Sequence, residues 1–73
     1  MKQIDAYLSR KASATWPLAT VSKEEIPPDD HHGPRTHFVL ERQGVEPISL
    51  GYNFGRAREA LYLLIKQAKG AGR

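Results

Sequence analysis

The 73-residue sequence contains no cysteine, so neither a disulfide nor a thiolate metal site can stabilise its fold. It also lacks any apolar run near the roughly 18 residues that a membrane-spanning helix needs. Its first five residues become polar too early to hold the apolar segment of a signal peptide. We therefore expect a cytoplasmic protein that has no membrane partner.

The sequence has little excess charge. Eleven lysines and arginines stand against eight aspartates and glutamates, a formal net charge of +3. This excess is weaker than that of most dedicated nucleic-acid binders, although it allows a local basic patch. A domain this small buries only about 60% of its unfolded surface. A partner, often a second copy of the chain, is the commonest remaining source of stability, so a homodimer is one hypothesis.

Motifs for catalysis are also missing. Gly51 and Gly55 are not followed by the lysine and hydroxyl residue of a phosphate-binding loop. No pattern that activates a hydroxyl surrounds Ser9, Ser13, Ser22 or Ser49. We expect no catalytic residue, no cofactor and a protein that is not an enzyme.

Residues 36–68 carry the clearest structural pattern. Apolar and polar residues alternate around Phe38 and Leu40, and again from Ile48 to Phe54. The spacing then becomes helical, with small and apolar side chains at Ala57, Ala60, Leu61, Leu64 and Ala68. The change predicts two strands followed by one amphipathic helix.

The hairpin formed by these strands has a predicted register. A two-residue turn would set Phe38 opposite Ser49, an apolar residue against a polar one. A three-residue loop at residues 42–44 keeps the apolar residues on one face and gives Gly44 the left-handed position. This loop predicts the cross-strand pairs Phe38–Ile48 and Thr36–Leu50.

The N-terminal half predicts one helix and one strand. Ile4, Tyr7 and Leu8 have helical spacing, which favours a helix over residues 2–11. Alternation favours a strand over residues 18–26, although residues 22–25 also fit a helix capping box. The fold class is then α+β: a small two-layer domain with the order α-β-β-β-α, in which both helices pack on one face of an antiparallel sheet.

The remaining segments are expected to be irregular within a single domain spanning residues 1–73. Residues 27–35 form a flexible loop rich in proline, aspartate and histidine. Residues 70–73 contain two glycines and are predicted to stop the helix and form a frayed tail.

The predicted element order resembles that of the double-stranded RNA-binding domain over nearly the whole chain. In that family, a histidine in the loop after the first strand enters the RNA minor groove, and His31 or His32 is the matching residue here. The family also has a lysine cluster at the start of its last helix, which contacts phosphates. The matching residues 57–61 contain one basic residue, Arg58, beside an acidic one. The resemblance therefore implies an RNA-binding order of elements without its main phosphate-binding motif.

Residues 29–32, Asp-Asp-His-His, form the only cluster of metal-ligand types, with His37 further along the chain. Imidazole and carboxylate can together bind zinc. Adjacent histidines in an extended loop point to opposite sides, however, so we interpret the cluster as a solvated loop and expect no metal. His31 and His32 are kept as secondary candidates for partner contact.

The outer face of the last predicted helix carries the main candidate site. At 100° per residue, basic residues and one tyrosine lie on one ridge, with Leu63 close by. These partner-binding candidates are Arg58, Tyr62, Leu63, Lys66 and Lys69. Tyrosine and arginine are common binding hot spots, whereas cations near a helix C-terminus are also typical of a plain solvated face.

The sequence therefore favours a small non-enzymatic binding protein that docks on a partner protein or a protein–nucleic-acid complex and modulates or inhibits it. Small chains without cysteine or catalytic motifs are common among bacterial and phage accessory proteins, including inhibitors such as anti-CRISPR proteins, a similarity of size and character. Two further hypotheses are a nucleic-acid-binding module and a homodimeric structural module.

Overall fold

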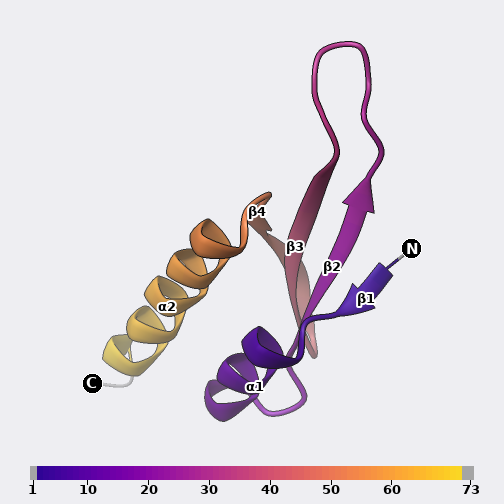
Figure 1. Ribbon diagram of the computed structural model, residues 1–73. Coiled ribbons are helices and arrows are strands. Elements are labelled where there is room, and N and C mark those ends of the chain that lie inside the picture. Colours follow the sequence, from indigo (N-terminus) through magenta and orange to yellow (C-terminus); the bar gives the residue numbers. More distant parts are fainter. Residues whose placement is uncertain (1, 72–73) are drawn as a thin grey trace.

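Four strands and two helices make up the computed structural model, which describes residues 2–71. The strands form one antiparallel sheet in the order β1-β2-β3-β4 (Figure 1). The elements are β1 Lys2–Ile4, α1 Ala6–Thr15, β2 Thr20–Ile26, β3 Arg35–Arg42, β4 Val45–Gly51 and α2 Phe54–Ala71. The predicted α+β class with an antiparallel sheet is confirmed.

β1 is an element that the sequence pattern did not predict. Lys2 pairs with Glu24 and Ile4 with Ser22, so β1 extends the sheet beside β2. The predicted helix over residues 2–11 is wrong at its start, since α1 begins at Ala6. The helix is capped by Asp5, whose Oδ1 accepts a hydrogen bond of 2.8 Å from the Leu8 amide. The element order is therefore β-α-β-β-β-α.

Both helices pack on the same face of the sheet, as predicted (Figure 1). α1 lies against β2, and α2 lies mainly against β4. Their inward side chains meet those of the sheet in one hydrophobic cluster. Its buried members are Leu8, Ala12, Ala19, Val21, Phe38, Leu40, Leu50, Ala57 and Leu61.

The turn between β3 and β4 has two residues rather than three. Arg42 lies opposite Val45, which leaves only Gln43 and Gly44 in the turn. Gly44 has a φ of +77°, the left-handed conformation that glycine adopts without strain. The predicted three-residue loop at 42–44 is therefore wrong.

The predicted cross-strand pairs Phe38–Ile48 and Thr36–Leu50 are wrong as well. Leu40 lies opposite Ile48, and Phe38 lies opposite Gly51, where β4 ends before it can reach Thr36. Two register shifts each place an additional residue on β4. One of them includes Pro47, which has no amide hydrogen to give to the sheet. The shifts restore the shared inward face, so Phe38, Leu40 and Leu50 are all buried.

Two boundaries differ from the sequence pattern. The alternation at 48–54 continues past the strand: Tyr52 is half exposed beyond β4, and Phe54 is the first residue of α2. At the other end, α2 continues through Gly70 to Ala71. The predicted helix stop at Gly70 is therefore wrong, and the rest of the predicted tail, residues 72–73, lies outside the described residues.

Candidate docking groove

The predicted ridge on α2 is exposed in the structure. Tyr62 is 68% exposed and Leu63 is 57% exposed, whereas their neighbour Leu61 is only 1% exposed. This contrast follows from helical periodicity, which turns one stripe of α2 toward the sheet and the opposite stripe away from it. Arg58, Lys66 and Lys69 are exposed as well.

A groove of about 760 Å³ separates α1 from α2 on the helix side of the molecule. It takes in four of the five predicted ridge residues, and only Lys66 lies outside its lining. Its walls combine apolar side chains of both helices with basic ones. The lining consists of Tyr7, Leu8, Lys11, Ala14, Thr15, Arg58, Glu59, Leu61, Tyr62, Leu63, Ile65 and Lys69.

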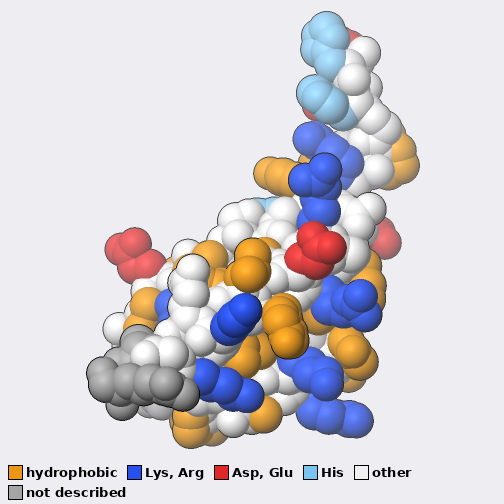
Figure 2. Space-filling model, turned by 90° about the vertical axis from the view of Figure 1, so that its left-hand side faces the viewer, with side chains coloured by type: hydrophobic (Ala, Val, Ile, Leu, Met, Phe, Trp, Pro, Cys, Tyr) orange, Lys and Arg blue, Asp and Glu red, His pale blue; other side chains and the backbone are white. Residues whose placement is uncertain are grey.

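The charge of the groove is predominantly basic. Its lining includes Lys11, Arg58 and Lys69 against a single acid, Glu59. The Lys11 ammonium lies 5.7 Å from the centre of the Tyr7 ring. No carboxylate of residues 2–71 forms an ion pair with Arg58 or Lys69. Figure 2 shows basic side chains distributed among the apolar ones on the face made by the helices.

Several contacts fix α1, which forms one wall of the groove, to the sheet. The Ser9 hydroxyl donates to the Val21 carbonyl at 3.1 Å and accepts from the Val21 amide at 2.8 Å. The Tyr7 ring lies 6.0 Å from that of Phe54, which in turn lies 6.2 Å from Phe38 in the core. The first turns of the two helices therefore meet above the sheet, and the groove has a defined end.

The sequence pattern does not reveal the α1 wall of the groove, since its partner-contact candidates lie on α2 and, secondarily, in the loop at His31 and His32. Tyr7 and Lys11 lie four residues apart, the spacing that places two side chains together on a helix. That signal was present in the sequence. Which α1 residues face α2, however, depends on how the two helices lie on the sheet.

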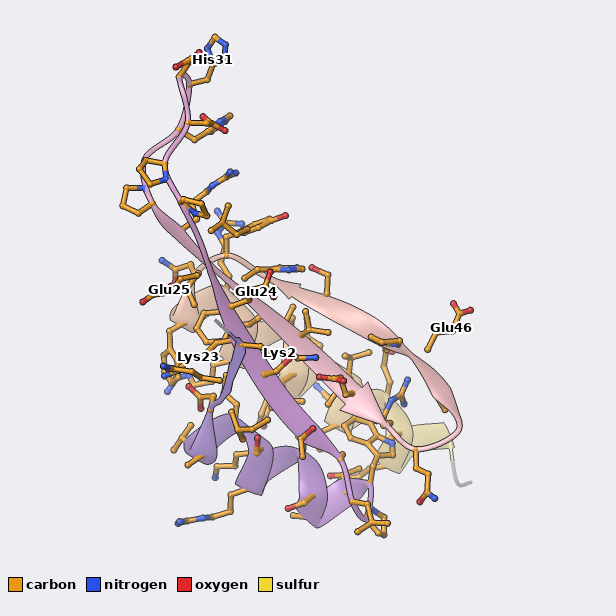
Figure 3. The ribbon with its side chains drawn as sticks, turned by 90° about the vertical axis from the view of Figure 1, so that its right-hand side faces the viewer. Lys2, Lys23, Glu24, Glu25, His31 and Glu46 are labelled. Carbon is orange, nitrogen blue, oxygen red and sulfur yellow. The ribbon has the colours of Figure 1, made fainter. Side chains whose placement is uncertain are left out.

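The two secondary candidates, His31 and His32, lie at the tip of the loop of residues 27–34, which projects away from the helices (Figure 1; His31 is labelled in Figure 3). The loop has its own hydrogen bonds. Oδ1 of Asp29 accepts from the His31 amide at 2.9 Å and from the His32 amide at 2.7 Å. These bonds hold the pKa of Asp29 below its ordinary value. The structure therefore does not bring the histidines to the groove.

Among residues 2–71, no three potential ligands from histidine, aspartate and glutamate are placed to share a metal ion. His37, the third histidine, lies on β3 rather than at the loop tip. Its Nε2 lies 2.6 Å from the Ser49 hydroxyl, and its ring stacks on Tyr52 at 4.7 Å. These contacts hold the segment after β4 against β3.

The Ser49–His37 contact is a pairing that the sequence did not reveal. A serine–histidine pair becomes a nucleophile when a third group orients the histidine and donors face the reacting carbonyl. In the described part of the chain, no carboxylate is hydrogen-bonded to His37. We therefore interpret the pair as a structural contact.

Neither helix within residues 2–71 has the length and hydropathy required of a membrane span. The additional strand β1 makes the element order differ from that of the double-stranded RNA-binding domain. Comparisons of the chain with protein-family models, with curated proteins and with solved structures found no match.

Proposed function

We propose that the protein is a small non-enzymatic binding protein that docks on a partner protein through the groove between α1 and α2. By occupying a surface of that partner, alone or within a nucleoprotein machine, it modulates or inhibits the partner. The observation that carries this proposal is an apolar groove edged by an exposed tyrosine, Tyr62, and by cations without ion-pair partners in the described chain.

The chemistry of the lining favours a protein over a nucleic acid as the direct contact. Leu63, which is 57% exposed, and the partly exposed Ile65 contribute to the groove, and aliphatic side chains have no favourable contact to offer a phosphate backbone. Tyrosine and arginine beside an apolar centre are instead the composition of protein hot spots. Tyr62 and Arg58 supply both residue types.

The test is affinity capture from a lysate of the source organism, with and without nuclease. We expect the wild-type protein to retain a partner after nuclease treatment and Tyr62→Ala to lose it. Val45→Ala is the matched control, because Val45 is 52% exposed but lies on β4, outside the groove lining. Its variant should retain the partner.

Two results would overturn the proposal. Capture that nuclease abolishes, with a steep loss of binding as salt rises, would assign the groove to nucleic acid. Equal retention by Tyr62→Ala and Val45→Ala would show that the groove is not the docking surface.

A further inference from the structure

We propose that the occupant of the α1–α2 groove is an amphipathic helix of the partner protein with acidic residues flanking its apolar face. This inference rests on the proposed function and names the partner's chemistry. It follows from the shape of the groove, the order of its apolar residues and the sign of its charge.

The shape of the groove suits a helix. Two helices that lie side by side on a sheet leave a furrow into which the side-chain ridge of a third helix can pack. The ten residues of α1 make the α1–α2 groove about 15 Å long at 1.5 Å per residue. That length accommodates close to three turns of a partner helix, enough for apolar anchors at positions i, i+3 or i+4, and i+7.

Apolar residues lie along the length of the groove. Tyr7, which is 48% exposed, meets Phe54 where the helices begin. On α2, Tyr62 and Ile65 lie in the lining about one turn apart, and Leu63 is exposed beside them. A row of contacts spaced by helical turns matches an apolar stripe on another helix. A compact ligand would need a closed pocket instead of an open furrow.

The charge of the groove selects an acidic partner. Lys11, Arg58 and Lys69 come from both helices and lie in the lining around the apolar residues. An occupant whose flanks carry aspartate or glutamate would pair with cations from both walls. A basic occupant would meet repulsion from these three cations.

A second copy of the chain cannot supply such a helix. α1 contains no acidic residue, and α2 contains only Glu59. In a two-fold dimer formed through the groove, the same patch faces itself. Lys11, Arg58 and Lys69 of one copy would then approach the same cations of the other. The groove therefore fits a different, acidic chain better than it fits itself.

The experiment is a selection from a library of 18-residue helical peptides that share an apolar stripe and draw their polar positions equally from acidic and basic residues. We expect acidic peptides to be enriched. In two-dimensional NMR, the selected peptide should shift the signals of Tyr7, Tyr62 and Ile65 and become helical on binding. Its affinity should weaken as salt rises.

Two charge reversals on α1 form a matched pair. Lys11→Glu changes a groove residue and should weaken the selected acidic peptide roughly fivefold or more. Arg10→Glu makes the same change one residue earlier, at an exposed position outside the lining, and should leave the affinity within about twofold. Circular dichroism of both variants checks that they remain folded.

Enrichment of basic peptides, no enrichment at all, or equal effects of the two reversals would overturn the inference. Tighter binding of a 20-nucleotide DNA or RNA to the same residues would overturn it too. These failures differ from failure of the proposed function. If nuclease-resistant capture still depends on Tyr62 while no acidic helix is selected, the groove binds a protein whose contact is of another kind.

Discussion

The two faces of the sheet differ in how their polar groups are satisfied. On the face turned away from the helices (Figure 3), Glu41 accepts from the Lys2 ammonium at 2.8 Å and from the Ser22 hydroxyl at 3.0 Å. On the same face, His37 is paired with Ser49. On the helix side, in contrast, Arg58 has no ion-pair partner among the described residues.

This difference indicates which surface of the fold can bind a partner without breaking existing side-chain bonds. On the open sheet face, Glu41 binds both Lys2 and Ser22, and His37 binds Ser49. Ser22 is only 2% exposed. A ligand there would have to break bonds that already exist. Within residues 2–71, Tyr62 and the groove cations have no such bonds to break, which is why we propose that docking takes place on the helix side.

The largest expected effect is the difference in unfolding free energy between a substitution in the inward stripe of α2 and one in its outward stripe. Leu61→Ala removes a side chain that is 1% exposed and should lower the free energy of unfolding by about 2–5 kcal/mol. Leu63→Ala deletes the same atoms at a position that is 57% exposed and should change it by less than about 0.5 kcal/mol. Urea unfolding followed by circular dichroism measures both values. Similar losses in the two variants would contradict the assignment of the inward stripe.

The next effect concerns the wall that α1 gives to the groove. Asp5→Ala removes the cap of α1 and should destabilise the protein by about 1 kcal/mol, because the Leu8 amide loses its acceptor. Asp5→Asn keeps an acceptor oxygen and should restore most of that loss. Thermal unfolding of the three proteins checks the order. If Asp5→Asn is as unstable as Asp5→Ala, the charge rather than the cap is responsible.

A smaller effect is a pH dependence on the open sheet face. The hydrogen bonds from Lys2 and then Ser22 hold the pKa of Glu41 below its ordinary value of 4.5. The unfolded chain therefore binds this proton more readily. The stabilisation is complete above pH 4.5 and is lost as the pH falls through the lowered pKa. Because the side chain is 36% exposed, we expect less than about 1 kcal/mol.

Glu41→Gln should remove this part of the pH dependence. The measurement is the free energy of unfolding in urea at pH 7 and at pH 3. Glu46→Gln, an exposed change on β4, controls for the loss of one negative charge. An unchanged difference between the two pH values in Glu41→Gln would show that the network on the open face contributes nothing.

The elements that could be predicted from the sequence are those whose pattern of apolar residues lies within a single segment of the chain. The apolar stripe of α2 repeats over three turns, and the alternation of β3 extends over enough residues to be recognised. β1 has only three residues, and it is a strand because Lys2 and Ile4 pair with β2 far along the chain. The β3–β4 register similarly depends on shifts in the ladder that include Pro47, which pattern alone does not locate.

The candidate site divides in the same way. Tyr62 and Leu63 could be predicted as exposed because their helix has a clear inward stripe. The groove could not be predicted, since it requires the distance between two helices and their orientation on the sheet. Lys66 belongs to the predicted ridge but lies outside the groove lining. The position of α1 decides which residues of α2 line the groove.

The smallest expected effect on stability is also the sharpest test of the comparison between the two faces. Tyr62→Ala removes a ring that is 68% exposed, so the free energy of unfolding should change by less than about 0.5 kcal/mol. Binding of the selected acidic peptide should weaken by about 2 kcal/mol, as for a hot-spot tyrosine. Tyr52→Ala reverses this pattern, because Tyr52 stacks on His37 and on the Arg35 guanidinium, outside the groove. It should cost stability and leave the peptide's affinity unchanged, as measured by urea unfolding and calorimetry. If both variants lose affinity, the two faces are not independent, and the docking surface extends around the edge of β4.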